Sequence, residues 1–460
     1  MLRAATLLTC SQSWRPVMRT LFHLPDQPSS RCDHGVLDLG GHVDTARFHA
    51  GIGSLDLLRA LRVSRQKCRP LALNVQLPAQ WMGDQYLPRL LHEIDLVACH
   101  LGAGRRVEQF QLAGGTPELA DLRRLMNRLH QRFTLLEHDG GDYSIDVDLR
   151  HTSWSTMGAL RDLGFNHVSI GVPDVGGEGG TTLANYQNPA PIHSLLDAAR
   201  TFGFRSVNVD LGYGHAWQTP ESFAQKLASI LELEPDRLLV FDYARPPQRY
   251  RSNPAGAYCN ELDKAAMRRS CFEQLADAGY HYLGLGQFVR PDDDLAIAQE
   301  RGRLRRHCEG FTRHGYCDNI GLGLGAISQI EDLYAQNTEQ LPRYQQLLDM
   351  DQLPTCRGWR CEAGSQISHL VVERLACDLE LDIAALEARY GLVFRQYFCD
   401  AWPMLEQLQR NGLIELSERF ISILPAGRPQ LDAICNLFQQ PVGAAQPDSH
   451  SEWINHDPFI

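Results

Sequence analysis

The sequence predicts an α/β protein built on a parallel sheet that closes into a full or partial barrel. Between about residues 71 and 288, short segments rich in Val, Ile, Leu and Tyr alternate with helical patterns every thirty residues or so, roughly the length of one βαβ unit. In such units a right-handed crossover joins neighbouring parallel strands. The chemistry of such a barrel is expected at the carboxyl ends of its strands.

The expected strands are short and bounded by turn residues or by helical patterns. In chain order they are Leu71–Leu77, Val107–Leu112, Tyr143–Val147, His167–Val172, Ser206–Leu211, Leu238–Tyr243 and His281–Leu285.

Two helices have clear start signals. The spacing of Leu119, Leu122, Met126, Leu129 and Phe133 predicts a helix over residues 117–133, with Thr116 as N-cap and Pro117 in the first helical position. The run Thr219-Pro220-Glu221-Ser222 repeats that start and predicts a second helix.

From about Glu331 the sequence changes to amphipathic helical patterns with few strand signals, and residues 412–423 predict a short hairpin after a helix. We therefore expect a poorly ordered N-terminal extension at 1–35, the barrel with an N-terminal segment at 36–330, a mainly helical C-terminal domain at 331–440 and a loose tail at 441–460.

Composition limits the function. The chain has 460 residues, a formal net charge of −11 and no dense Lys/Arg block, which argues against nucleic acid or an anionic membrane as a partner. Its 13 cysteines are scattered, as in reduced cytoplasmic proteins, and we expect a cytoplasmic location. No stretch is apolar for long enough to span a membrane, and the run Ala4–Leu8 is too short for a signal-peptide core.

Small and acidic residues follow several of the expected strands. They are the segments 113–117 (AGGTP), 144–148 (SIDVD), 208–214 (NVDLGYG) and 241–244 (FDYA). A single aspartate here is as well explained by helix capping as by a ligand. Several together at one barrel mouth favour a binding site.

The order of these and other motifs resembles that of the oxygen-independent coproporphyrinogen III oxidases, also called coproporphyrinogen dehydrogenases, of the radical-SAM superfamily. The resemblance covers nearly everything from about Gly41 to Phe438. The motifs are LALNVQLP at Leu71, AGGTPEL at Ala113, SIDVDLR at Ser144, GFNHVSIGVPD ending at Asp174, NVDLGYG at Asn208, QTPESFA at Gln218, RPDDDLAIAQ at Arg290, GLGLGAIS at Gly321 and YAQN at Tyr334.

The resemblance implies a radical-SAM-type partial (βα)6 TIM-like barrel with a mainly helical C-terminal domain that acts as a lid. It implies S-adenosylmethionine and a [4Fe–4S] cluster as cofactors, and oxidative decarboxylation of two propionates of coproporphyrinogen III, which yields protoporphyrinogen IX in heme biosynthesis. By resemblance, the residues that line the nucleotide pocket are Gly114, Gly115, Thr116, Asp146, Asp210, Ala244 and Ile327.

One departure from the family affects the chemistry directly. The family holds its cluster with a C-x3-C-x2-C motif after the first strand, because three thiolates on one loop bind three irons. Here that loop reads PAQWMGDQY from Pro78 to Tyr86, with Gln80 in place of the first ligand, and Cys99 is the sole cysteine between this loop and Gly114. We therefore assign no catalytic and no metal-ligating residue.

Other departures lie at pocket positions. Asparagine cannot supply the forked donors of arginine, and proline has no side-chain amide. The replacements are Asn74 for a tyrosine, Ala113 for a glycine, Asp146 for a glutamate, Pro173 for a glutamine, Asn185 for an arginine and Gly286-Gln287 for an Asp-His pair.

No other catalytic centre is indicated by the sequence. The residues His92, His100, His130 and His138 form no H-x-x-x-H or H-E-x-x-H pair, and no G-x-S-x-G elbow is present. The C-terminal helices and hairpin are not basic enough to favour a winged-helix DNA reader.

Three interpretations follow. In the first, the protein is a monomeric, catalytically impaired relative that binds a small-molecule tetrapyrrole (coproporphyrinogen or heme) or a nucleotide such as S-adenosylmethionine. In the second, it is an active coproporphyrinogen III dehydrogenase whose cluster is held unconventionally, by Cys68, Cys99 or a partner protein. The third is a decaying paralogue without a present role.

Overall fold

The computed structural model describes residues 37–38, 42–43, 45–78, 83–114, 117–137, 140–149, 151–172, 190–244, 258–307, 310–361 and 363–438. The expected N-terminal extension at 1–35 and the expected tail at 441–460 lie outside this range, as do Gln80, Gly115, Thr116, His138, Pro173 and Asn185.

Six parallel strands form the centre of the molecule and neighbour one another in chain order, apart from the short strand β5 (Phe133–Leu135), which pairs beside β4. The predicted partial (βα)6 arrangement is therefore confirmed. The strands are β3 (Leu71–Gln76), β4 (Arg105–Ala113), β6 (Asp142–Asp148), β7 (His167–Gly171), β8 (Ser206–Tyr213) and β9 (Arg237–Asp242).

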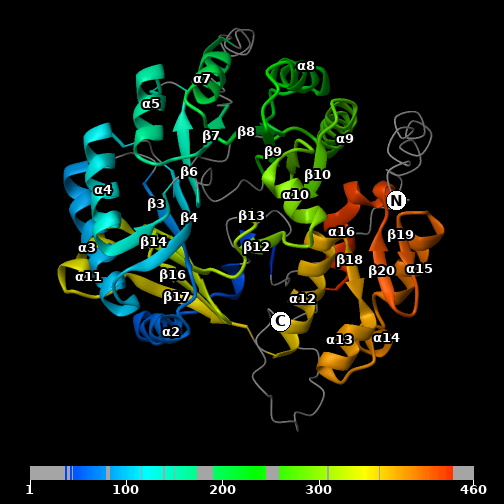
Figure 1. Cartoon of the computed structure of the whole chain (residues 1–460). Coiled ribbons are helices and arrows are strands. Elements are labelled where there is room, and N and C mark those ends of the chain that lie inside the picture. The colour runs from blue at the N-terminus through cyan, green and yellow to red at the C-terminus, as the bar shows by residue number, and fades with distance from the viewer. Residues whose placement is uncertain are drawn as a thin grey trace, which may run out of the picture.

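Helices follow these strands and lie on the outer side of the curved sheet (Figure 1). They are α3 (Gly83–Leu101), α4 (Leu119–Arg132), α5 (Trp154–Asp162), α7 (Ala190–Thr201), α8 (Pro220–Leu231) and α9 (Glu261–Asp277), and α2 (Ser54–Lys67) precedes the first strand.

The sheet is open because its two outermost strands do not pair with each other. Beyond β9 lie the antiparallel strands β11 (Gln287–Val289) and β10 (His281–Gly284). At the other edge, β14 (Asp318–Gly323) runs parallel to β3 and is followed by the antiparallel strands β15 (Ile327–Ile330), β16 (Leu333–Asn337) and β17 (Thr355–Arg360).

Strands β16 and β17 lie after residue 331, where the sequence showed few strand signals, so that expectation is wrong for residues 333–360. The physical reason is their mixed composition: these strands carry Gln336, Asn337, Arg357 and Arg360 and gain their order from antiparallel pairing rather than from an apolar run. The boundary expected at residue 330 therefore does not coincide with an edge of the sheet.

The two faces of the parallel strands differ in chemistry, since alternate residues of a strand point to opposite faces. The face toward the helices carries the Leu, Ile, Val and Phe side chains of the main core. The inner face is polar. Residues paired across strands share a face, and the pairings place Asn74, Gln111, Ser144 and His167 in one inner row and Asp146, Ser169 and Asn208 in the next.

The two expected helix starts differ in outcome. At α8 the prediction is confirmed: the Thr219 side chain accepts a hydrogen bond from the Ser222 amide, and Pro220 is the first helical residue. At α4 it is wrong by two residues, because Glu118 is the N-cap and the helix begins at Leu119. Pro117 is buried there rather than standing in the first helical turn.

The remaining elements are not strands of the large sheet. They are β1 (Leu37–Asp38), β2 (His42–Val43), η1 (Thr45–Arg47), α10 (Asp294–Glu300), the hairpin β12 (Arg305–His307) and β13 (Gly310–Thr312), α11 (Leu341–Asp349), α12 (Ala363–Asp378), β18 (Glu380–Asp382), α13 (Ile383–Tyr390), α14 (Phe394–Tyr397), α15 (Trp402–Arg410), β19 (Ile414–Leu416), β20 (Phe420–Ile423), η3 (Pro425–Gln430) and α16 (Leu431–Asn436).

The expected C-terminal hairpin is confirmed as β19 and β20, and β18 joins it as a third strand that the sequence did not indicate. Buried residues of the C-terminal segment, such as Val371, Leu375 and Leu405, belong to the same core as those of the parallel strands. The C-terminal helices lie beside the barrel, below α9 and α10 in Figure 1.

Candidate active site at the carboxyl ends of the parallel strands

The predicted pocket residues within the described part of the chain lie toward one end of the sheet. Gly114 directly follows β4, Asp146 and Asp210 lie near the carboxyl ends of β6 and β8, and Ala244 follows β9. Ile327 is the first residue of β15, beside β14. Parallel strands end at the same edge, so the fold gathers these positions along one rim.

Gly114 is required by the backbone at this rim. Its φ is +103°, and a Cβ atom there would lie 2.3 Å from the carbonyl oxygen of Leu77. The amide of Leu77 donates to the carbonyl of Ala113 at 2.8 Å, which joins the ends of β3 and β4. The glycine therefore lets two strand ends approach, and it leaves its own backbone without a covering side chain.

Asp210 is held by its neighbours on the inner face. Its side chain is 2% exposed and accepts hydrogen bonds from Asn208 Nδ2 at 2.6 Å and from Ser169 Oγ at 3.3 Å. Asp146 lies opposite Ser169 in the strand register and is partly exposed. The two carboxylates thus flank β7, with Ser169 between them.

Ser169 was not assigned to the site from the sequence, and Asn208 was included only as part of the segment 208–214. A usable signal was available: each falls on the polar side of a strand whose other side is apolar.

Asn74 is a buried amide without partners on the inner face. It is 2% exposed, and among the residues that the structure describes neither its Oδ1 nor its Nδ2 atom has a hydrogen-bond partner. A buried amide of this kind is costly unless something bonds to it. Asn74 stands two residues before the end of β3 and is paired with Gly321 of β14.

Aromatic rings gather where β8 and β9 end. The His215 and Tyr243 rings are stacked at a centroid distance of 3.8 Å, His215 also stacks on Trp217 at 5.8 Å, and Phe241 meets Tyr243 edge-on at 5.1 Å. Trp217 is 38% exposed. We name His215, Trp217, Phe241 and Tyr243 the aromatic cluster.

Ala244 and Ile327 have mainly structural surroundings. The Ala244 amide donates to Asp242 Oδ1 at 2.8 Å, in the turn after β9. Ile327 is buried in a small core with Phe48 and Tyr334. Its carbonyl oxygen would lie 2.5 Å from a Cβ at Gly321, so its backbone lies closely against β14.

A charged network lies at the opposite, amino-terminal end of the strands. Asp142 accepts hydrogen bonds from Arg313 Nε at 2.7 Å and pairs with His314 Nε2 at 3.0 Å, and its Oδ1 lies 3.4 Å from both Arg205 and His167. Burial alone would raise the pKa of Asp142, but its partners outweigh burial and hold the pKa well below its usual range. This end of the sheet is therefore an ion-pair structure.

The cysteines proposed to replace the missing motif lie at the same amino-terminal end. Cys68 follows α2, shortly before β3 starts, and Cys99 is near the end of α3, shortly before β4 starts. Each is separated from the rim by the length of a strand, about 20 Å for six residues. Cys259 lies nearer the rim, where its amide bonds the carbonyl of Gly214, so these three thiols do not converge.

Comparison with known proteins identifies the family. The chain is 42% identical over 417 residues to an oxygen-independent coproporphyrinogen III oxidase of Pseudomonas aeruginosa, which covers 86% of this chain and 91% of that protein. It is 35% identical to the Escherichia coli protein of the same name, over 85% of this chain and 90% of that protein. This chain belongs to the oxygen-independent coproporphyrinogen III oxidase family.

Two further comparisons agree with this membership. Residues 365–429 match the family model described as the HemN C-terminal domain. The solved structure described as "Coproporphyrinogen III oxidase (HemN) from Escherichia coli is a Radical SAM enzyme" superposes with a TM-score of 0.77 at 33% identity, covering 88% of this chain and 99% of that chain. The fold is thus that of a radical-SAM member of this coproporphyrinogen oxidase family.

The described residues do not fit the [4Fe–4S] cluster that radical-SAM membership implies. A cluster with an open iron needs three convergent thiolates, and no cysteine occurs in the loop after β3. Burial raises the pKa of the Cys259 thiol, which further disfavours it as a thiolate ligand. We derive no reaction step through a cluster from this structure.

Proposed function

We propose that this chain acts in the coproporphyrinogen branch of heme biosynthesis as a tetrapyrrole- and nucleotide-binding member of its family, without performing the oxidative decarboxylation alone. One observation carries the proposal. The inner face of the sheet is polar, and the loop after β3, at the rim of that face, lacks the ligands for a cluster. The fold supports binding of a tetrapyrrole and a nucleotide. The loop after β3 lacks the residues that would start the radical reaction.

The rim offers groups suited to S-adenosylmethionine. Carboxylates at Asp146 and Asp210 can accept from ribose hydroxyls and from an ammonium group, and the bare backbone at Gly114 admits a ligand closely. The partnerless amide of Asn74 can both donate and accept. These groups would bind and orient the nucleotide.

The aromatic cluster supports the tetrapyrrole half of the proposal. Its rings give flat, partly exposed apolar area next to the polar inner face. Pyrrole rings can stack on such area, and aromatic pairs contribute about 0.5–1.5 kcal/mol beyond the area that they bury.

The first test is anaerobic reconstitution of the full-length protein with iron and sulfide, followed by iron analysis and a S-adenosylmethionine cleavage assay. We expect no cluster absorption and no cleavage, together with saturable binding of coproporphyrin III detected by its fluorescence. A His215→Ala variant should bind the porphyrin more weakly, whereas Trp154→Ala, an exposed aromatic on α5, should bind it normally.

A second candidate function is active coproporphyrinogen III dehydrogenation with an unconventionally held cluster. The extent of the identity to the Pseudomonas relative favours it. About four irons per chain with S-adenosylmethionine cleavage would establish this function and overturn the first one. Because Cys68 and Cys99 lie at the wrong end of the sheet, changing both to serine should leave such a cluster intact.

A monomeric state and a cytoplasmic location are also proposed. No helix in the part of the chain that the structure describes is long and apolar enough to cross a bilayer. Sedimentation of the purified protein tests the first, and fractionation of cells tests the second.

A further inference from the structure

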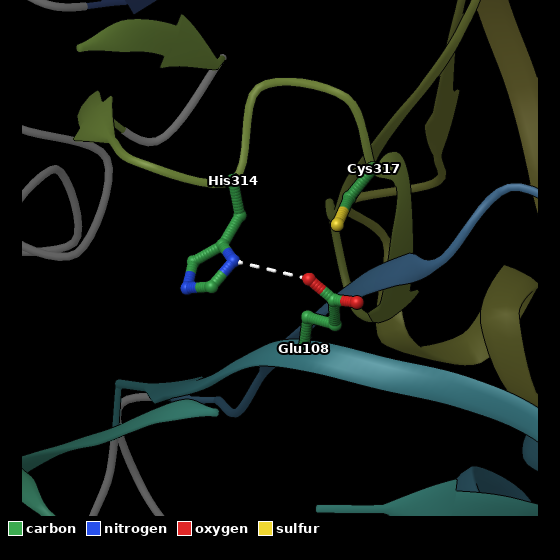
Figure 2. A group of neighbouring side chains, drawn as sticks. All are labelled: Glu108, His314 and Cys317. Atoms are coloured by element: carbon green, nitrogen blue, oxygen red, sulfur yellow. Dashed lines mark ion pairs between the residues drawn. The ribbon is translucent and has the colours of Figure 1, made fainter. Parts of the chain in front are cut away.

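A group of metal-ligating side chains lies away from the rim, at the amino-terminal end of the strands. Glu108 of β4 faces His314 and Cys317, which precede β14, and each of the three is less than 9% exposed. One ligand atom from each lies within 4.8 Å of those of the other two. Figure 2 shows the His314 and Cys317 side chains pointing toward the Glu108 carboxylate. We name these residues the 108–314–317 cluster.

The local backbone presents all three side chains. The register between β3 and β4 shifts so that Leu71 pairs with Val107 and Ala72 with Gln109, which leaves Glu108 as the extra residue of a bulge. Bulges re-aim a side chain that the regular pleat would point elsewhere. His314 and Cys317 are brought together by one turn, in which the Cys317 amide donates to the His314 carbonyl at 3.0 Å.

The spacing of the ligand atoms fits a small tetrahedral metal ion. Metal–nitrogen and metal–oxygen bonds of about 2.1 Å at a tetrahedral angle place the two ligand atoms about 3.4 Å apart. The distance from His314 Nδ1 to Glu108 Oε2 is 3.4 Å. That separation is longer than a normal N–H···O hydrogen bond.

The surrounding contacts resemble those that orient metal ligands. His314 Nε2 pairs with Asp142 Oδ2 at 3.0 Å, and a proton on Nε2 leaves the Nδ1 lone pair facing the cluster. The Tyr316 hydroxyl donates to Glu108 Oε2 and lies 3.5 Å from His314 Nδ1, and Arg106 pairs with Glu108 Oε1 at 3.0 Å. Asp142 therefore orients the imidazole and Arg106 the carboxylate, and the Tyr316 hydroxyl lies beside both ligand atoms.

Charge also balances with a divalent ion. Cys317 is buried, and its thiol gives up a proton when it binds a metal ion. Metal binding forms the metal–sulfur bond and releases that proton to solvent. One thiolate and one carboxylate then neutralise the two charges of the ion.

A second group of metal-ligating side chains lies nearby and differs from the 108–314–317 cluster. Asp142, His167 and Asp294 also come close together, but Arg205 lies within 3.4 Å of Asp142 and also pairs with Asp294, while Arg313 pairs with both carboxylates. Guanidinium groups already occupy the place that a cation would take. The same argument does not apply at the 108–314–317 cluster, where Arg106 reaches Glu108 from a largely exposed position.

We propose that Glu108, His314 and Cys317 form a metal site of the zinc class that fastens the segment before β14 to the bulge in β4. The mixed thiolate, imidazole and carboxylate set suits zinc. The site lies at the opposite end of the sheet from Gly114 and the aromatic cluster, so it is independent of the proposed function.

Cobalt(II) is the probe that tests this site. The chelator-treated, reduced full-length protein is titrated with cobalt(II), and bound metal and absorption are measured. We expect one cobalt per chain with a thiolate-to-cobalt charge-transfer band. Cys317→Ser should lose that band, and Glu108→Gln should keep it while binding at least about tenfold more weakly. Cys356→Ser, an exposed cysteine on β17, should behave as the parent.

Two outcomes would overturn the proposal: no stoichiometric binding to the parent protein, or the same charge-transfer band in Cys317→Ser. Circular dichroism of each variant separates loss of a ligand from loss of the fold. Zinc competition then adds a second measure, since zinc should displace cobalt and raise the melting temperature of the parent but not of Cys317→Ser.

Discussion

Gly114 shows that a pocket position can require glycine for a structural reason. At Gly114 the φ of +103° and the 2.3 Å approach to Leu77 both exclude a side chain. Gly164 has a similar φ of +98° but open space around it. Comparing substitutions at Gly114 and Gly164 therefore separates the effect of backbone strain from the effect of a steric clash.

We expect Gly114→Ala to lower the free energy of unfolding by about 3 kcal/mol or more, because the ends of β3 and β4 must separate. Gly164→Ala should cost about 1–2 kcal/mol, the strain of a left-handed residue alone. Urea unfolding of both variants measures the difference. Equal costs would mean that the strand ends move freely, and the packing role of Gly114 would then be rejected.

Arg306 gives a second prediction at this scale. It is 6% exposed, burial lowers its pKa, and none of its three guanidinium nitrogens has a hydrogen-bond partner within the described part of the chain. Replacing such a charge by an apolar side chain of similar length is neutral or stabilising by about 1–4 kcal/mol. We therefore expect Arg306→Met to melt at or above the parent temperature, whereas Arg205→Met, which strips Asp142 and Asp294 of a partner, should melt lower.

At the scale of elements, Glu93 fastens one helix to three neighbours. This residue of α3 is buried and accepts hydrogen bonds from the Gly323 amide at 2.8 Å, from Asn337 Nδ2 at 2.6 Å and from the Tyr344 hydroxyl at 2.6 Å. Those donors come from β14, β16 and α11. Burial raises the pKa of Glu93 to about 7, although the three donors oppose the rise.

The sign of the pH effect follows from this shift. The unfolded chain loses the Glu93 proton near pH 4.5, whereas the folded chain keeps it until about pH 7, so stability falls as pH rises through that window. The loss is on the order of 3 kcal/mol. Glu93→Gln has no such proton. Between pH 5 and pH 8 its free energy of unfolding should therefore rise relative to that of the parent. A constant difference would contradict the raised pKa.

The sequence predicted the elements whose pattern is local and missed those that depend on pairing. The run from Ser206 to Leu211 is apolar on one side and polar on the other, and the start at Thr219 contains its own cap. By contrast, β17 and β18 pair with β16 and β20, which are not adjacent to them in the chain. The 108–314–317 cluster was missed for the same reason, since Glu108 and His314 are brought together by a bulge and a turn.

At the scale of the whole molecule, one large core joins the barrel to the C-terminal helices, and this has a consequence for unfolding. Asp432 of α16 accepts a hydrogen bond from the Tyr282 hydroxyl of β10 at 3.2 Å and from the Leu285 amide at 3.4 Å. Buried side chains from β3 to α16 belong to one continuous cluster. The sequence suggested two domains, but contacts of this kind tie the C-terminal helices to the edge of the barrel.

We therefore expect the described part of the chain to unfold in one cooperative transition, because neither half can expose its share of the core without uncovering the other. Far-ultraviolet circular dichroism and tryptophan fluorescence should give coincident urea curves. Trp359 of β17 reports on the sheet, and Trp402 of α15 reports on the C-terminal helices. The variants Trp359→Phe and Trp402→Phe each lack one of these reporters. Their unfolding curves should have the same midpoint. Separate midpoints would instead establish an independently folding C-terminal domain.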